Sequence, residues 1–401
     1  MRILAFAYAC EPGKGSEPGA GWGLARMLVE FGEIWVITRA NNRTSIEAAL
    51  PSVPEAGRLH FEYVDLPAWA RWWKRGQRGV RLYYLLWLGA ALRRARRLHH
   101  AEPFDLVWHL TLANAWLGTT APLVGPRFVY GPVGGGVTVP LRLFPSLGLR
   151  GIAYEFVRGL ARRGGRYLNP LARLAWRKAS LILVQNPETR AWLPRRYRRK
   201  AVVLPNVFAA DLDGILPSGE RRSAAPPVAL FAGRLLPWKG LSLALRALEL
   251  GPDWRLVVFG SGPDLGRLRR LAHRYGVAHR AEFRGWQPRE EVLRAMRDEA
   301  NVLLFPSLHD EAGWVVAEAL ACGLPVVCLD HGGPPVVARA LEAWPTPEGQ
   351  EAAVLACALS EAAAVRSVAF QPPGSKIAGT TGGSIREVAA LLGSALHVAE
   401  E

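Results

Sequence analysis

The sequence predicts an α/β protein built from two doubly wound, Rossmann-like domains. Short apolar runs alternate with helix-period patterns along the chain, which is typical of parallel sheets with helices on both faces. The series of runs restarts after residues 211–227, a segment rich in Gly, Pro and charged residues. A length of 401 residues with 50% hydrophobic residues is sufficient for two separate cores.

The first half is expected to form strands at residues 2–9, 33–38, 59–64, 104–110, 127–130 and 180–185. The second half is expected to form them at "VALFAG", "WRLVVFG", "AEFRG", "NVLLFP" and "PVVCL". We therefore place a first domain at 1–210, a linker at 211–227, a second domain at 228–384 and a final helix at 385–401 that could cross back to the first domain. Two such domains imply a cleft between them, with ligands bound at the carboxyl ends of the strands.

The stretch "GKGSEPGAGWG", residues 13–23, predicts a glycine turn between the first strand and the amphipathic helix "WGLARMLVEFG". It is not a nucleoside-triphosphate loop, because Lys14 is followed by Gly15 and Tyr8 stands where that motif begins with glycine. The glycine spacing also fits the dinucleotide pattern poorly. An anion bound at the helix N-terminus and a flexible turn without a ligand both remain open.

Positive charge is concentrated in the first half of the chain. Residues 1–205 hold 31 Lys and Arg against 12 Asp and Glu, a net +19, whereas the rest holds 19 against 22, a net −3. A nucleic-acid partner is disfavoured, because no nucleic-acid-binding motif accompanies this charge. Arginines and aromatic residues around a short apolar stretch fit an anionic membrane surface better. An arginine-rich genome with merely solvated faces is the alternative.

The apolar runs and cysteines indicate the compartment. The run "LYYLLWLGAAL" has eleven residues, well short of the roughly 20 that a membrane-spanning helix needs. The four cysteines show neither metal-ligand spacing nor a paired framework, which is typical of a reducing compartment. We expect a cytoplasmic protein, peripheral on the inner face of the plasma membrane.

Two motifs of the second half place charge where parallel strands end. "FAGRLLPWKG" follows the first strand of the second domain, and its Arg234 and Lys239 can reach one anion if the loop curls. In "FPSLHDEAGWVVAEALACGLPVV", Asp310 lies in the loop after a strand, Gly313 opens a helix and Glu318 follows about 7 Å along the helix axis. That offset suits a diphosphate at the helix N-terminus and a ribose beside the carboxylate. Taken singly, each charge would be an ordinary solvated side chain.

These motifs together resemble the family-4 glycosyltransferases, which are retaining enzymes of the GT-B fold among the glycosyl transferases of group 1. The resemblance rests on "FAGRLLPWKG", the D-x7-E of "DEAGWVVAE", "ALACGLPVV" and "GPVGGG", with support from "PGKGSEPGAGWG", "LPNVF" and "FGSGPDL". It covers most of the chain and fades after about Pro335. Asp310 stands where the family normally has Glu, which puts the choice of donor in doubt.

The resemblance implies a role for each matching position. Arg234 and Lys239 would hold the diphosphate of a nucleotide sugar, Asp310 the donor sugar and Glu318 the ribose. His109 would be the active-site histidine, although alone it would be read as a packed core residue. The other donor-binding positions implied by the resemblance are Gly19, Gly21, Gly262, Gly285, Trp286 and Gly313. Of these, Gly19 and Gly21 would approach the phosphates or the sugar from the first domain, and the backbone around Gly285 and Trp286 would meet the base.

The expected reaction moves a sugar from a nucleotide-diphosphate sugar to a saccharide or lipid-linked saccharide, in cell-surface polysaccharide or glycolipid assembly. Two cations and a helix N-terminus can stabilise a diphosphate leaving group, so no metal and no cofactor are expected. As the family is thought to do, the leaving phosphate can take the proton of the acceptor on the same face of the sugar. The alternative is a catalytically silent, membrane-associated scaffold on the same fold.

Overall fold

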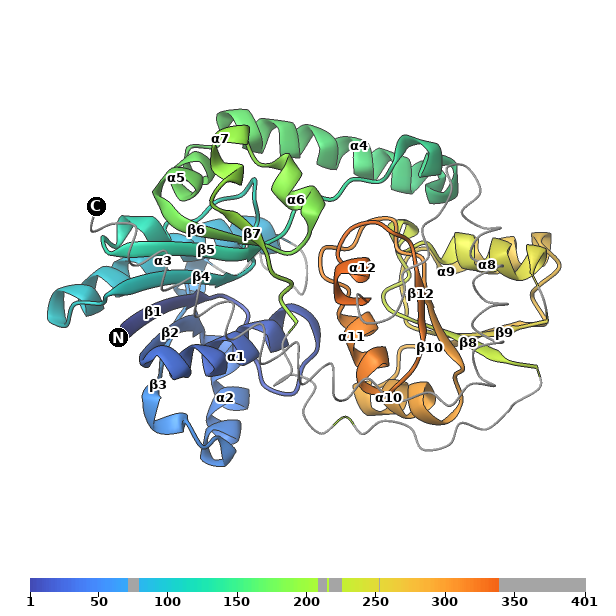
Figure 1. The fold of residues 1–401 in the computed structure, drawn as a ribbon, viewed down its shortest axis with the longest axis horizontal. Coiled ribbons are helices and arrows are strands. Elements are labelled where there is room, and N and C mark those ends of the chain that lie inside the picture. The colour runs from blue at the N-terminus through green and yellow to red at the C-terminus, as the bar shows by residue number, and fades with distance from the viewer. Residues whose placement is uncertain (71–78, 208–214, 216–225, 252, 339–401) are drawn as a thin grey trace. The chain divides into compact units, whose positions relative to one another are not determined.

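The computed structural model describes residues 1–70, 79–207, 215, 226–251 and 253–338 (Figure 1). The chain divides into two compact units, each built around its own parallel sheet. Every strand expected from the sequence is present, with ends that differ by about three residues at most. The predicted α/β architecture is therefore confirmed for both units.

The first unit contains a seven-stranded parallel sheet with the order β3-β2-β1-β4-β5-β6-β7. Its strands are β1 (Arg2–Ala7), β2 (Glu33–Arg39), β3 (Leu59–Val64), β4 (Leu106–Thr111), β5 (Arg127–Val133), β6 (Ala179–Val184) and β7 (Ala201–Val203). Its helices are α1 (Ser16–Leu28), α2 (Arg43–Ala49), α3 (Val80–Ala101), α5 (Pro170–Lys178), α6 (Pro187–Trp192) and α7 (Arg195–Arg198). The short strand β7 was not expected from the sequence.

Each face of this sheet buries a separate core. Ile3 and Ala5 of β1 pack in the core that α1 covers, and the alternate residues Leu4 and Phe6 pack in the core that α3 and α5 cover. The strand order reverses direction between β1 and β4, which are hydrogen-bonded neighbours. The loops after β1 and β4 therefore begin side by side, at the edge where doubly wound sheets bind ligands.

The second unit contains a five-stranded parallel sheet with the order β10-β9-β8-β11-β12. Its strands are β8 (Val228–Ala232), β9 (Arg255–Phe259), β10 (Ala281–Gly285), β11 (Val302–Phe305) and β12 (Val326–Cys328). Its helices are α8 (Leu241–Leu250), α9 (Leu265–Arg274), α10 (Arg289–Asp298), α11 (Trp314–Ala321) and α12 (Pro334–Val337). Here the order reverses between β8 and β11, so the loops that follow these two strands begin side by side.

The long helix α4 (Phe144–Leu168) is shared between the units. It is interrupted at Gly148, where φ is +67°. Residues 137–160 belong to the second unit, whose core buries Val139, Leu143 and Leu147. The first unit thus differs from the predicted domain 1–210, because the apolar side chains of this segment complete the other core.

Three further expectations concern the glycine turn before α1, the linker and final helix, and membrane-spanning helices. Helix α1 begins at Ser16, so the predicted glycine turn is correct only for its first residues. The linker at 211–227 and the helix at 385–401 lie almost wholly outside the described residues. Within the part of the chain that the structure describes, no helix is both long and apolar enough to cross a membrane.

Candidate functional site

The reversal point of the second sheet brings together two of the charged residues singled out in the sequence. The loop after β8 carries Lys239, and the loop after β11 carries Asp310. The Lys239 ammonium group forms an ion pair with the Asp310 carboxylate, and both side chains are largely buried, at 21% and 17% exposed. Residues 71 positions apart in sequence therefore form one charged centre at the carboxyl edge of the sheet.

Backbone contacts hold these two loops against each other. Gly240, directly after Lys239, has a φ of +74°, and a Cβ there would lie 1.7 Å from the carbonyl oxygen of Pro306. Only glycine allows both this conformation and this approach. The Leu308 amide donates a hydrogen bond to the Trp238 carbonyl at 2.8 Å. The neighbours of Lys239 and Asp310 are thus fixed by main-chain contacts as well as by the ion pair.

Arg234, the second predicted cation, is exposed in the same loop after β8. Within the described residues it has no ion pair or side-chain hydrogen bond. The loop therefore offers one cation that is already neutralised by a carboxylate and a second that faces solvent.

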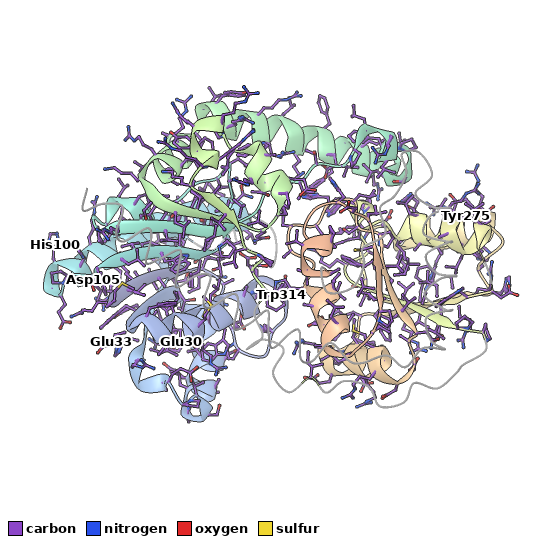
Figure 2. All side chains as sticks on the ribbon, in the orientation of Figure 1. Glu30, Glu33, His100, Asp105, Tyr275 and Trp314 are labelled. Atoms are coloured by element: carbon purple, nitrogen blue, oxygen red, sulfur yellow. The ribbon has the colours of Figure 1, made fainter. Side chains whose placement is uncertain are left out.

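Helix α11 begins at this edge of the sheet. Gly313 takes the N-cap position with a φ of +79°, and Trp314, labelled in Figure 2, is the first helical residue. The Glu318 side chain, in the middle of the helix, is 13% exposed and accepts a hydrogen bond from Arg289 Nε of α10 at 2.7 Å. Arg289 was not predicted, because α10 lies outside every motif of the sequence.

The remaining second-unit positions have different environments. Gly262 is required by packing, because a Cβ there would lie 2.3 Å from the Leu235 carbonyl oxygen. Gly285 has a φ of +73° with open space around it, and its carbonyl accepts from the Gly260 amide at 2.7 Å. The adjacent Trp286 is 71% exposed, which is unusual for a large aromatic side chain. An exposed indole after a sheet edge is a suitable platform for a planar ligand.

In the first unit, the glycines of the N-terminal stretch belong to a helix. Gly19 and Gly21 both lie inside α1 and are buried. A Cβ at Gly21 would lie 2.1 Å from the Ala9 carbonyl oxygen, so this glycine allows α1 to pack against the chain after β1. Their predicted approach to a donor phosphate stays a prediction, and packing gives an independent reason for Gly21.

Glu17, in the same stretch, was not singled out from the sequence. Its carboxylate accepts a hydrogen bond from the Leu112 amide, in the loop after β4, and one from the Asn206 side chain at 3.3 Å. Burial raises the pKa of the Glu17 carboxyl, and the Leu112 amide partly offsets the effect. Ser16 and Leu112 both have positive φ values, of 66° and 51°. Glu17 therefore connects the start of α1 with the loop after β4, at the reversal point of the first sheet.

His109 occupies the packed position that its sequence context alone suggests. The side chain is fully buried in β4, with Nε2 2.9 Å from the Tyr84 hydroxyl and Nδ1 3.0 Å from the Thr119 hydroxyl. Burial lowers the pKa of the ring from 6.5 to about 3, partly offset by a backbone hydrogen bond with Thr111. Both ring nitrogens have protein partners in this structure, and the expected role of His109 in the active site stays a prediction.

Sequence reasoning also missed a buried charged group beside Asp310. Glu155 of α4 contacts His309 and Arg158, at 3.1 and 3.2 Å. Burial by itself raises the pKa of the Glu155 carboxyl, but the hydrogen bond with His309 and the charge of Arg158 hold it below its usual range. Glu155 and His309 are 154 residues apart in sequence, so no local spacing could have revealed their contact.

The structure thus brings one cluster of the predicted residues together within the second unit. Lys239, Asp310 and the start of α11 meet at one sheet edge, and Glu318 is fixed there by α10. His109, Gly19 and Gly21 belong to the first unit. Among the described residues, no group of three or more His, Cys, Asp or Glu side chains is placed to hold a metal ion.

Comparison with known proteins gives one family match. Residues 218–362 match the family model described as glycosyl transferases group 1. The chain is 38% identical over 151 residues to the D-inositol 3-phosphate glycosyltransferase of Mycobacterium sp. (strain KMS), covering 34% of this chain and 33% of that protein. It is 33% identical over 224 residues to the GDP-mannose-dependent alpha-(1-6)-phosphatidylinositol monomannoside mannosyltransferase of Mycolicibacterium smegmatis, covering 50% of this chain and 58% of that protein.

These matches thus span between a third and about three fifths of the length of those relatives. Among solved structures, the chain is similar to Anabaena HepE in complex with UDP and glucose, with a TM-score of 0.57 and 19% identity. That similarity covers 98% of this chain and 100% of the other, so it extends over both units.

Proposed function

Since the second half of this chain belongs to the group 1 glycosyl transferases and the chain has their GT-B fold, we propose that it is a glycosyltransferase that uses a nucleotide-diphosphate sugar. The acceptor is a saccharide or a lipid-linked saccharide, in the assembly of cell-surface polysaccharide or glycolipid. The observation that carries this proposal is the meeting of Lys239, Asp310 and the α11 N-terminus at the reversal point of the second sheet.

Each side chain of this centre has a part in the proposed donor complex. Arg234 and Lys239 bind the diphosphate together with the N-terminus of α11. Asp310, which already holds Lys239, accepts hydrogen bonds from hydroxyls of the donor sugar. Glu318 binds the ribose, and its hydrogen bond with Arg289 fixes the orientation of the carboxylate. The exposed Trp286 stacks on the base.

The proposed transfer proceeds with retention of configuration and without a metal. The bond between the anomeric carbon and the phosphate oxygen breaks, and negative charge develops on the leaving diphosphate. Arg234, Lys239 and the helix N-terminus stabilise that charge, which is the work that a metal ion performs in other sites. The acceptor hydroxyl attacks the same face of an oxocarbenium-like sugar, and its proton passes to the leaving phosphate oxygen.

We further propose that the protein binds peripherally to an anionic membrane on the cytoplasmic side. In α3, Leu82 and Leu86 are 56% and 45% exposed, and the exposed Arg93 and Arg97 follow in the same helix. In α4, the apolar and aromatic side chains that are more than half exposed are Leu149, Phe156, Val157, Leu160, Tyr167 and Leu168. Apolar side chains beside arginines are the combination that an anionic lipid surface attracts.

The donor site can be tested by the thermal stability of the purified protein. UDP-, GDP- and ADP-sugars are added without metal to the wild-type protein and to Arg234→Ala/Lys239→Ala. The matched control is Arg270→Ala/Arg274→Ala, which removes the same charge from exposed positions of α9. We expect one nucleotide sugar to raise the melting temperature of the wild type and the control, and not that of the site variant.

The other outcomes are equally informative. An unchanged shift in the site variant would place the donor elsewhere. No shift with any nucleotide sugar, from a folded protein, would favour the catalytically silent scaffold. For the donor so identified, transfer in excess chelator tests metal independence, and the anomeric configuration of the product, read by nuclear magnetic resonance, tests retention.

A further inference from the structure

The segment at residues 137–160 comes from the first half of the chain but packs on the two loops of the candidate donor site. Its first part is anchored by apolar burial, with Val139, Leu143 and Leu147 in the core of the second unit. After the interruption at Gly148, the helix α4 continues, and one of its faces contacts the loops that carry Lys239 and Asp310 through Gly151, Tyr154, Glu155 and Arg158.

The contacts with the first loop are made to the residues just before Lys239. The Tyr154 ring stacks on the Trp238 ring, with the centroids 4.2 Å apart and the planes 13° from parallel. One turn earlier, a Cβ at Gly151 would lie 2.7 Å from the Pro237 Cβ, so the helix backbone approaches this loop closely. The position of Trp238, and with it the start of the Lys239 side chain, is set by α4.

The contacts with the second loop are made to both neighbours of Asp310. Glu155 is 3.1 Å from His309 Nδ1, and Arg158 is 3.6 Å from Glu311 Oε1. Glu155 and Arg158 are also paired with each other at 3.2 Å, with side chains only 4% and 5% exposed. Ion pairs this buried are costly to break, because the remaining partner stays as an uncompensated charge. The loop is therefore held on both sides of Asp310 by two charged side chains that are almost wholly shielded from solvent.

We propose that Glu155 and Arg158 are positioning residues that hold the loop of Asp310 in the geometry that donor binding requires. In this proposal they do not touch the donor. They act through His309 and Glu311, while Tyr154 acts in the same way on the Lys239 loop. Because a displacement of about 1 Å at a reacting centre can cost about 100-fold in rate, such a clamp matters to a site made of two loops. The consequence for donor binding rests on the proposed function, whereas the clamp itself does not.

The clamp can be tested without any ligand, by hydrogen exchange. The Leu308 amide, which donates to the Trp238 carbonyl, reports whether the two loops stay together. We expect at least tenfold faster exchange at Leu308 in Arg158→Ala and a smaller increase in Glu155→Gln, whose amide can still pair with His309. The matched control is Arg150→Ala, an exposed arginine of the same helix, for which no change is expected.

Amides of β9 distinguish a local effect from unfolding, because they should exchange equally slowly in every variant. Arg158→Lys, which keeps the charge, should restore much of the protection. Wild-type exchange at Leu308 in both Arg158→Ala and Glu155→Gln would overturn the clamp. Loss of protection in β9 as well would also overturn it, since the residues would then support the whole unit and not the loop.

Donor affinity tests the second half of the proposal. For the nucleotide sugar that stabilises the wild type, Arg158→Ala should weaken binding at least tenfold and lower kcat more than it raises KM, and Arg158→Lys should recover both. Faster loop exchange with unchanged affinity and turnover would overturn the positioning role. If the wild type binds no nucleotide sugar, the proposed function fails, and the exchange at Leu308 still decides whether α4 holds the loop.

Discussion

Lys239 and His109 show how far the environment of one residue decides what it can do. Lys239 is paired with Asp310, so a bound diphosphate must share this cation with a carboxylate, while the exposed Arg234 supplies a second positive charge. His109 has both ring nitrogens engaged and is fully buried. Lys239 is therefore half of an ion pair at a sheet edge, whereas His109 is packed inside the core of its unit.

The buried ring of His109 predicts how acid affects stability. Its pKa is about 3 in the folded protein, against 6.5 for an unperturbed ring, so between these values the unfolded chain binds a proton that the native ring does not. The free energy of unfolding should then fall by up to about 1.4 kcal/mol for each pH unit below 6.5. Denaturant unfolding of the wild type and of His109→Asn between pH 4 and 7 measures this contribution.

We expect a shallower loss of stability with acid in His109→Asn. The matched control is His100→Asn, since that histidine is exposed at the end of α3. If the wild type and His109→Asn lose stability in parallel, the ring is not buried in its neutral form.

Among the elements, α1 is a helix that includes part of a glycine-rich stretch predicted to be a turn. Five glycines within residues 13–23 predict a turn, yet the helix begins at Ser16 and incorporates Gly19, Gly21 and Gly23. The reason is the close approach of α1 to the chain after β1, where only a residue without a Cβ fits. Packing thus overrides the low helix propensity of glycine.

A pair of Gly→Ala variants can separate packing from ligand contact. Gly21→Ala places a Cβ 2.1 Å from the Ala9 carbonyl oxygen and should destabilise the protein by about 1–3 kcal/mol. Gly89→Ala, in α3, meets no atom within 4 Å and should stabilise it by about 0.5–1 kcal/mol through helix propensity. Melting temperatures compare the two directly. Normal stability of Gly21→Ala with lost donor binding would instead support the predicted contact with a phosphate.

Over the full chain, the distribution of charge supports the proposed membrane binding. The first 205 residues carry a net +19 and the rest a net −3, and exposed apolar side chains of α3 and α4 lie among the arginines. Residues 71–78, which add to this basic segment, lie outside the described part of the structure. The charge attracts an anionic surface from a distance, and the apolar side chains bind once they reach it.

Vesicle binding tests this distribution. The protein should sediment with vesicles that contain anionic lipid and not with neutral ones, and salt should weaken the binding. Phe156→Ser/Leu160→Ser, on the exposed face of α4, should weaken it at least tenfold, because each side chain loses about 1.5–3 kcal/mol of apolar burial. The variant should keep the wild-type melting temperature. Equal binding by the variant and the wild type would show that this face of α4 does not contact the membrane.

All the strands except β7, the division into two α/β units and the loops that carry Arg234, Lys239, Asp310 and Gly313 could be derived from the sequence. These features are local: strand and helix periods, and glycine at a strand end, are readable within about ten residues. Neighbouring parallel strands end at the same edge of the sheet, so the loops that follow them meet there. The amino-acid order therefore determines the kind of site and the candidate residues for it.

Only the folded chain shows which partners those residues have. The hydrogen bond of Arg289 with Glu318, the contacts of Glu155 and Arg158 beside Asp310, and the burial of His109 all join segments far apart in sequence. The assignment of residues 137–160 to the second unit is of the same kind, since it depends on where three apolar side chains find a core. Burial and charge pairing depend on which residues lie close together in the folded chain, so periodicity and motif spacing do not predict them.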